Sequence, residues 1–363
     1  MSLSFQLRRT RRPAAVALAG ALSLGLAACA SGDDDDEAAD DASHGELTVQ
    51  YSWIKNEEFA GEFYAEERGY YEDAGFSEVT AVAGPSTGVA ELLEETVDVA
   101  LSDAASVGAA IAEEDVPLKI IGATFQKNPF TILSLKDGAD IQTPEDLKGK
   151  KIGVQSSNEN VFNALLNANG ISRDEVEVVP VQFDPTPLIE GEVDGFMAYL
   201  TNEAITVGAQ QEVTNLAYAE NGVPYVAETF TITDAFLAEN REALKDFLIA
   251  EIKGWTDVFQ EPTADTVDLV EKFYNAGAEA GDINKDFGPL PPTTGESLEA
   301  EKELISTEET EANGLFTISE DLQAETVASL AAAGWDVAAD DLFDTSLLEE
   351  IYEESPELKD YLP

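Results

Sequence analysis

Cysteine and histidine are almost absent from this sequence of 363 residues, which contains one of each, Cys29 and His44. Cys29 directly follows an apolar run near the start of the chain and His44 precedes the first predicted strand, so neither is expected to contribute to a Ser-His-Asp triad, a Cys-His pair or a metal centre in the folded body. A hydrolase that uses only carboxylates stays open, although so many acids make no single pair distinctive. We therefore expect a protein with no catalytic residues, no metal and no cofactor, rather than an enzyme.

Basic residues are also scarce, because 20 Lys and Arg face 73 Asp and Glu, for a formal net charge of −53. Such a surface repels nucleic acids and anionic lipid headgroups, so neither is expected as a partner. The acids are spread through the whole chain, which is typical of adaptation to a salty habitat where dissolved ions screen self-repulsion.

No hydrophobic run reaches the length of a membrane-spanning helix, which needs about 20 apolar residues. The longest run, residues 14–28, has 15 residues and follows four arginines at positions 8, 9, 11 and 12. A basic start, a short apolar stretch and small residues at its end are typical of an export signal. The paired arginines leave Sec and Tat export undecided.

The end of this signal, Leu26-Ala27-Ala28-Cys29, resembles the lipobox of bacterial lipoproteins. The resemblance implies removal of residues 1–28 and a lipid on Cys29 that holds the protein on the outer face of the cytoplasmic membrane. The alternative is an ordinary secretory signal that ends at a chance cysteine. Residues 29–45 are small or acidic and predict a solvated tether without a core.

From residue 46 onwards, short β-rich runs alternate with helical ones, as in an α/β protein. Thr143 and Asp146 form a predicted capping pair around Pro144. The expected strands are residues 47–51, 79–82, 97–101, 118–125, 130–135, 151–155, 176–180, 195–199, 214–217 and 229–233. The expected helices are residues 59–73, 88–95, 104–113, 158–169, 186–190, 203–210 and 234–260, followed by a mainly helical C-terminal region.

These elements predict two α/β lobes. The first lobe takes residues 46–133 and 228–363, with the C-terminal helices, and the second takes residues 134–227. Two extended crossings between the lobes leave a cleft at the carboxyl ends of the strands, where open α/β sheets bind ligands. Hinge closure around a ligand is the expected mechanism.

Several motifs then match one known family in order along the chain. Trp53 is followed by Gly61, Ala65 and Gly69, and then by Tyr71 and Gly75. This is similar to the opening of the NMT1/THI5-like and SsuA-like binding proteins of ABC importers. There, a strand with a tryptophan precedes a Gly-x-x-x-Ala-x-x-x-Gly-x-(Tyr/Phe)-x-x-x-Gly helix. Further matches lie at residues 97–100, 117–122, 143–153 and 191–203, so the resemblance spans residues 47 to about 255.

The resemblance implies a type II periplasmic-binding-protein fold, a clamp of two lobes that delivers a small solute to a permease and its ATPase. It implies a monomer whose cleft is lined by Trp53 and residues 56–63, by the turn after residue 101 and by the helix start after residue 155. Residues 199–203 close the cleft from the second lobe. At these positions and nearby, the predicted ligand-binding residues are Trp53, Asn56, Phe59, Phe63, Asp103, Phe125, Ser156, Ser157, Asn158, Tyr199, Asn202 and Glu203.

The chemistry of these residues suits a flat, polar solute. The aromatics offer faces for stacking a heterocycle, and the polar residues offer hydrogen bonds to its edge. Other roles remain open for each: core packing for the aromatics, helix capping for residues 156–158, and a favourable acid in the first helical turn for Glu203.

Members of this superfamily carry sulfonates, taurine, nitrate, thiamine-pyrimidine precursors or riboflavin. An anion site would want an arginine, a lysine or a bare helix N-terminus, yet among the candidate segments only Lys55 is basic. We therefore expect an aromatic heterocycle such as an aminopyrimidine or a flavin. The alternatives are a sulfonate, taurine or nitrate binder, a sensor or adhesion lipoprotein, and an enzyme like the fungal thiamine-pyrimidine synthases. The enzyme is disfavoured because those synthases use a histidine within their own chain and a cysteine-rich segment. This sequence has no cysteine-rich segment, and its single histidine precedes the first predicted strand.

Overall fold

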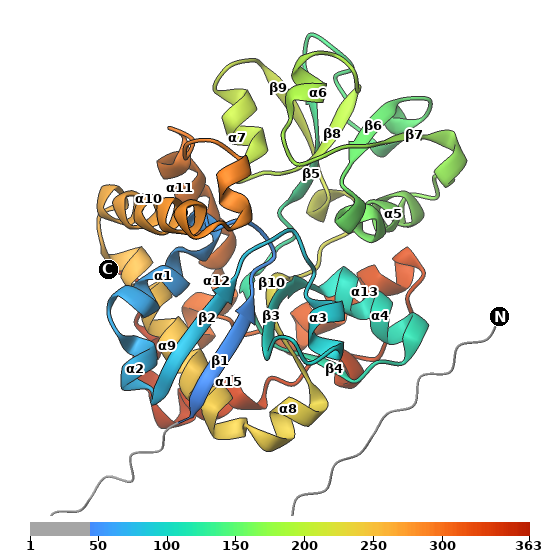
Figure 1. Cartoon of the computed structure of the whole chain (residues 1–363). Helices are drawn as coiled ribbons and strands as arrows, with labels where there is room; N and C mark the ends of the chain where they lie inside the picture. The colour runs from blue at the N-terminus through green and yellow to red at the C-terminus, as the bar shows by residue number, and fades with distance from the viewer. Residues whose placement is uncertain (1–43) are drawn as a thin grey trace, which may run out of the picture. The chain divides into compact units, whose positions relative to one another are not determined.

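The computed structural model describes residues 44–363, which form one compact unit of two five-stranded sheets flanked by helices (Figure 1). The predicted signal, the predicted lipidation residue Cys29 and most of the predicted tether lie outside the described residues. Within residues 44–363, no helix combines the length and the apolar character needed to cross a bilayer.

The first sheet has the strand order β2-β1-β3-β10-β4. Strands β2 and β3 run parallel to β1, whereas β10 returns from late in the chain and pairs antiparallel with both β3 and β4. The carboxyl ends of β1 and β3 therefore lie at the same edge. The strands are β1 Gly45–Gln50, β2 Phe76–Val82, β3 Val99–Asp103, β4 Leu118–Phe125 and β10 Ala227–Thr233.

The second sheet repeats this plan with the order β7-β6-β8-β5-β9. Strands β7 and β8 run parallel to β6, and β5 lies antiparallel between β8 and β9. The strands are β5 Phe130–Leu135, β6 Lys151–Val154, β7 Glu177–Pro180, β8 Gly195–Tyr199 and β9 Val213–Ala217. The second sheet thus begins at Phe130, so the predicted boundary at residue 134 falls inside β5.

The chain crosses between the two lobes twice, through residues 126–129 and 218–226. Asn128 joins the two crossings, because its side-chain amide donates to the carbonyl of Val223 at 3.0 Å. Its side-chain oxygen accepts from the backbone N–H of Phe130 at 2.9 Å. Tyr218 and Tyr225 of the second crossing are fully buried. The second crossing was expected to be extended but contains the 3₁₀ helix Ala219–Asn221, so the hinge is a packed pair of segments of which only part is extended.

Helices and short 3₁₀ turns fill the rest of the described chain. Thr143 and Asp146 form the predicted capping box at η2. In the first 260 residues the helical segments are η1 Glu57–Phe59, α1 Ala60–Glu67, α2 Tyr70–Asp73, α3 Val89–Leu93, α4 Ala104–Glu114, η2 Pro144–Leu147, η3 Ser156–Asn158, α5 Glu159–Ala168, η4 Arg173–Glu175, α6 Thr186–Ile189, α7 Glu203–Gly208, η5 Ala219–Asn221, α8 Asp234–Glu239 and α9 Arg241–Gln260. Beyond them lie α10 Thr263–Ala280, η6 Ile283–Asp286, α11 Thr294–Ile305, α12 Glu308–Asn313, α13 Glu320–Ala333, α14 Ala339–Leu342, α15 Ser346–Glu354 and η7 Pro356–Lys359.

Two predicted helices are divided in the structure. The helix expected over residues 59–73 is interrupted at Gly69, which adopts a left-handed conformation with φ of 75°. The helix expected over residues 234–260 breaks at Asn240, whose side-chain amide donates to the carbonyl of Phe236 at 3.3 Å. An asparagine that bonds to nearby backbone in this way competes with helix continuation.

Helices α1 and α9 cross at two glycines, and this crossing fixes where α1 begins. A Cβ added to Gly254 would lie 2.1 Å from the carbonyl oxygen of Gly61, and one added to Gly61 would lie 2.2 Å from the Trp255 ring. Only glycines allow this approach of the two backbones. The short helix η1, which leads into α1, is thereby held beside the end of β1.

The C-terminal helices cover the first lobe, and α13 also reaches the second. In Figure 1, α13 lies beside α4 and below α5, and the Asn167 side chain of α5 donates to the carbonyl of Ala333 at 2.7 Å. One apolar cluster contains buried residues of both lobes, among them Val107 of α4, Leu165 of α5 and Leu330 of α13. The two lobes are thus packed together on this side of the molecule.

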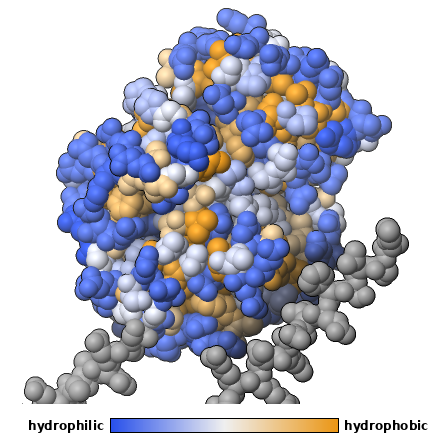
Figure 2. Space-filling view, viewed as in Figure 1, coloured by the Kyte–Doolittle hydropathy of each residue, from blue (hydrophilic) through white to orange (hydrophobic). Residues whose placement is uncertain are grey.

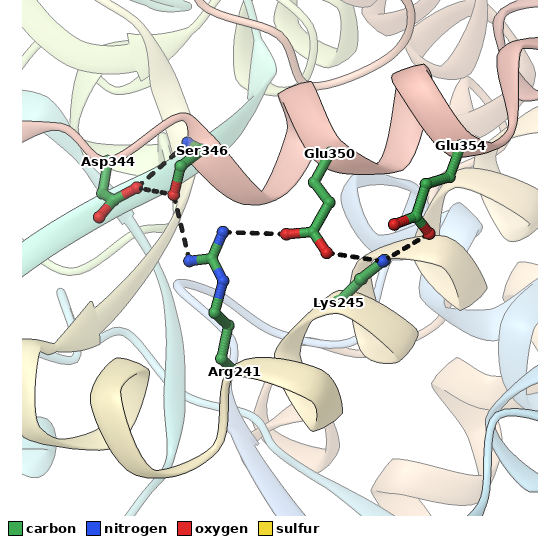
Figure 3. A network of polar contacts seen from close by, with 6 residues as sticks. All are labelled: Arg241, Lys245, Asp344, Ser346, Glu350 and Glu354. Carbon is green, nitrogen blue, oxygen red and sulfur yellow. Dashed lines mark hydrogen bonds and ion pairs between the residues drawn. The ribbon is translucent and has the colours of Figure 1, made fainter.

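A group of ion pairs attaches α15 to α9 (Figure 3). The Lys245 ammonium donates to Glu350 at 2.9 Å and to Glu354 at 2.7 Å, while Arg241 donates to Glu350 at 3.1 Å. The Lys245 side chain is 11% exposed. Its carboxylate partners raise the pKa of Lys245, and Lys245 and Arg241 lower the pKa of Glu350.

We expect Lys245→Met, which keeps the apolar stem and removes the charge, to lower the free energy of unfolding by about 1 kcal/mol in low salt. Urea unfolding measures the loss, which should shrink in about 1 M salt because surface ion pairs are screened. Lys136→Met is the matched control, since Lys136 is 58% exposed and pairs only with the exposed Glu212. Equal effects of the two substitutions would contradict a stabilising role for this network.

Candidate functional site

A cleft with a cavity volume of about 70 Å³ lies between the two lobes, at the carboxyl ends of the parallel strands. Ser52 and Trp53 follow β1, Ser102 and Asp103 end β3, and Gln155 follows β6. The full lining is Ser52, Trp53, Glu58, Ser86, Thr87, Ser102, Asp103, Phe130, Gln155, Ser157, Asn158, Phe183, Met197, Ala198, Tyr199, Asn202, Glu203 and Glu228.

Four carboxyl groups line this cleft, and none of its lining residues is a lysine or an arginine. Lys55, the one basic residue among the candidate segments, does not line the cleft and pairs with Asp282 at 3.0 Å. Within residues 44–363, no group of three or more His, Cys, Asp or Glu side chains is arranged to hold a metal ion. The cleft therefore offers acceptors and negative charge, and the donors facing it are neutral.

Glu228 is aimed into the cleft by an irregularity in β10. The register of β10 against β3 shifts between Ala227 and Thr229, and Glu228 has a φ of 47°, which is rare for a residue with a side chain. Such bulges re-aim a side chain beside a functional site. The Glu228 carboxylate accepts from the Ser52 hydroxyl at 2.9 Å and from the Tyr199 hydroxyl at 3.3 Å. It is thus contacted from both lobes.

Two other acids support the ends of their own helices while facing the cleft. Asp103 caps α4 by accepting from the backbone N–H of Ser106 at 2.9 Å and from its hydroxyl at 2.7 Å. Glu203, in the first turn of α7, accepts from the backbone N–H of Tyr199 at 2.9 Å. Burial raises the pKa of Asp103 and raises the pKa of Glu203 to about 7.

Aromatic rings separate this cleft from a larger outer cavity of about 440 Å³. Trp53 and Phe183 line both spaces, with ring centroids 3.9 Å apart and planes tilted by 55°. Phe287 meets Trp53 edge-on at 5.3 Å from the outer side. Trp53 and Phe183 come from different lobes, so movement of one lobe against the other would part them. Figure 2 shows a molecular surface on which hydrophilic residues predominate around scattered apolar ones.

The structure brings most of the predicted site residues together. Trp53, Asp103, Ser157, Asn158, Tyr199, Asn202 and Glu203 line the inner cleft. Asn56, which is 3% exposed, lines the outer cavity. Ser156 is exposed at the start of η3 and lines neither cavity.

The other three predicted aromatics belong to the core of the first lobe and do not line the cleft. Phe59 is fully buried and stacks on Tyr51 with centroids 4.2 Å apart, and Phe63 stacks on Phe273 at 4.5 Å. Phe125 is also fully buried, at the end of β4. All three side chains pack in one buried apolar cluster and none of them lines the cleft, so we leave them out of the proposed site.

Several lining residues were not predicted. Glu58 lies within the segment 56–63 that the sequence marked, but no pattern distinguished its carboxyl from the many others. Glu228 precedes a predicted strand, and nothing in the sequence signals its left-handed backbone. Phe183 comes from an irregular segment between β7 and α6, where periodicity carries no information.

The only histidine of the sequence is held away from the cleft. His44 was expected in a free tether, but its ring forms a 2.7 Å contact with Asp246 and packs against Phe76, with ring centroids 5.1 Å apart. It directly precedes β1, whose opposite, carboxyl end leads to the cleft.

A family model described as NMT1/THI5 like matches residues 56–265, and the chain belongs to that family, as its motifs predicted. It is 25% identical over 254 residues to the riboflavin-binding protein RibY of Chloroflexus aurantiacus, a match that covers 66% of this chain and 69% of RibY.

Among solved structures, the alkanesulfonate-binding protein SsuA of Xanthomonas axonopodis bound to MOPS matches with a TM-score of 0.60 and 16% identity, covering 82% of this chain and 96% of SsuA. The periplasmic nitrate-binding protein NrtA of Synechocystis matches with a TM-score of 0.59 and 13% identity, covering 88% and 91%. These likenesses confirm the predicted periplasmic-binding-protein fold.

Behind the cleft, further buried carboxyls lie in the first lobe, and Glu251 of α9 is the most deeply buried. Tyr71 donates to Glu251 at 2.5 Å, and burial raises the pKa of Glu251 to about 8. Between pH of about 4.5 and about 8, the folded state therefore holds a proton that the unfolded state has lost. Raising the pH through this window lowers the free energy of unfolding.

We expect Glu251→Gln to reduce the slope of the free energy of unfolding against pH by the contribution of roughly one proton, because an amide stays neutral at every pH. Urea unfolding of both proteins at mildly acidic and mildly alkaline pH measures the change. Glu325→Gln, at an exposed position of α13, is the control and should leave the slope unaltered. A wild-type protein whose stability rises steadily toward alkaline pH would contradict the assignment.

Proposed function

We propose that this protein is the extracytoplasmic solute-binding component of an ABC importer and that it captures a small aromatic heterocycle of the flavin or aminopyrimidine type. The observation that carries this proposal is the charge of the cleft, which has four acids and no cation among its lining residues. A sulfonate or nitrate bound there would face carboxyls without a basic partner. A heterocycle with N–H donors would meet acceptors.

The aromatic lining supports the same class of solute. Trp53, Phe183 and Tyr199 could hold a flat ring between the lobes, and closure would remove it from water. A solute larger than a single ring could extend past Trp53 into the outer cavity. This favours a flavin over an aminopyrimidine, in agreement with the similarity to RibY, which is named as a riboflavin-binding protein.

An enzymatic role is a weaker proposal. His44 bonds to Asp246 away from the cleft, and the lining residues of the cleft include no cysteine or histidine. Thiol chemistry would lack its nucleophile there, and acyl transfer through a lining serine would lack a histidine base. Capture and release of an unchanged solute need only the clamp.

A thermal-shift panel tests the proposed solute class. We expect riboflavin or a hydroxymethyl aminopyrimidine to raise the melting temperature in high salt, because a ligand stabilises the state that binds it. Taurine, an alkanesulfonate and nitrate should leave it unchanged. In the same assay, Trp53→Ala should reduce the shift and Trp53→Phe should restore part of it. Stabilisation by the anions alone would overturn the proposed solute.

We further propose that Cys29 carries a lipid that attaches the protein to the outer face of the cytoplasmic membrane, facing its permease. The support is the motif Leu26-Ala27-Ala28-Cys29 after a short apolar run.

We expect Cys29→Ser to leave the protein in the aqueous phase of a detergent partition, whereas the wild-type protein enters the detergent phase, because the acyl chains supply the membrane affinity. Mass spectrometry of both proteins gives the second readout. A Cys29→Ser protein that still enters the detergent phase and carries the acyl mass would contradict the anchor.

A further inference from the structure

Glu58 and Glu228 both line the cleft, and each carboxyl group affects the pKa of the other. Glu58 lies on η1 and is 4% exposed, and Glu228 lies on β10 and is 2% exposed. Glu228 also accepts from Ser52 and Tyr199. Two buried carboxyl groups that interact do not both ionise, so the pair holds a proton, and Glu228, which accepts from two hydroxyls, is the one suited to be the carboxylate.

Two polar atoms beside this pair have no partner within residues 44–363. The Oε1 atom of Glu58 is buried without a hydrogen bond, and so is the hydroxyl of Ser102, which is 2% exposed. Both residues line the cleft. Buried polar atoms are rarely left unpaired, and each such atom costs about 1–3 kcal/mol. An acceptor and a hydroxyl left unpaired in the lining of one cleft indicate that a bound solute completes them.

The groups that act on the pair from neighbouring elements are acids or a tyrosine. They are Glu57 on η1, Glu62 on α1, Asp103 on β3, Tyr199 on β8 and Glu301 on α11. Burial and the neighbouring carboxylates Glu228 and Glu301 raise the pKa of Glu58 well above its usual range, and burial raises the pKa of Glu228 to about 7. Without a nearby cation, a proton is the only positive charge that the described residues supply to the pair.

We propose that Glu58 and Glu228 are the polar anchor of the cleft, which accepts N–H donors of the solute and exchanges its shared proton when the solute is a cation. This inference rests on the proposed function. The free pair carries one proton and one negative charge. A neutral heterocycle donates an N–H to the open acceptor and leaves that proton in place.

A protonated aminopyrimidine brings its own positive charge, so the proton between Glu58 and Glu228 leaves for the solvent. The two carboxylates and the bound cation then carry one net negative charge, as the free pair did. The buried charge is therefore the same in the free site and with either kind of solute. An anion such as a phosphorylated flavin would add negative charge that nothing in the lining offsets.

The test uses riboflavin and a hydroxymethyl aminopyrimidine as probes, with titration calorimetry in phosphate and in Tris, whose ionisation heats differ. We expect Glu228→Gln to weaken binding of the active probe at least tenfold. Glu58→Gln should weaken it severalfold, because its amide still donates to Glu228. Glu58→Gln should also abolish the difference in binding heat between the two buffers with the protonated aminopyrimidine, because the pair then has no proton to release. Glu251→Gln, a buried acid outside the cleft lining, should change neither affinity nor proton release.

Unchanged affinity in Glu228→Gln would overturn the anchor. A second measurement needs no ligand: carbon-13 NMR of glutamate-labelled protein follows the titration of Glu58. We expect Glu228→Gln to lower the titration midpoint of Glu58, because the neighbouring carboxylate is removed. An unchanged midpoint overturns the shared proton. If neither probe binds the wild-type protein, the proposed solute class fails, and the NMR titration still decides whether the pair shares its proton.

Discussion

The scarcity of positive charge is the constraint on which the rest of this structure depends. Lysines and arginines are few, and the ones in ion pairs act at the periphery. Lys245 and Arg241 hold α15 on α9, and Lys55 pairs with Asp282. None of them lines the cleft, so the acids there cannot be neutralised by ion pairs. Protons, hydroxyls and backbone amides must do so instead.

Two local features of the backbone place those acids. The glycines at the crossing of α1 and α9 bring η1, with Glu58, to the end of β1. The bulge in β10 turns Glu228 toward the same point from a strand that returns late in the chain. The left-handed glutamate is a strained conformation, and the close helix crossing admits only glycine at positions 61 and 254. Their common result is a carboxyl pair between the lobes.

The sequence predicted the fold well because its signals are local and repeated. Strands 118–125, 130–135 and 195–199 agree with the structure to the residue, since each is a short apolar run between turns. The errors have local causes as well. Asn240 divides a helix through its own side chain, and Gly69 does so through a left-handed turn. Periodicity over a long window averages out such single residues.

The site was predicted less completely because the sequence pattern of a side chain that faces a cleft does not differ from that of a side chain buried in the core. Phe59 and Phe63 lie on the marked segment but pack inward. Glu58, between Asn56 and Phe59, faces the cleft. In a chain with 73 acids, a carboxyl is recognised as functional only when its surroundings are known. The orientation of the Glu228 side chain depends on a left-handed backbone conformation that the residue type does not predict.

The two kinds of acid in this protein respond differently to salt. Surface carboxylates repel one another through water, so dissolved ions at molar concentration, with a screening length of about 3 Å, remove most of that repulsion. The Glu58–Glu228 pair is almost fully buried, and ions in solution screen such a pair far less. Salt therefore reduces the repulsion between surface carboxylates and leaves the electrostatic field of the buried acids in the cleft largely unscreened. The proposed preference for neutral or cationic solutes over anions can therefore persist in a concentrated salt solution, where an exposed site would lose it.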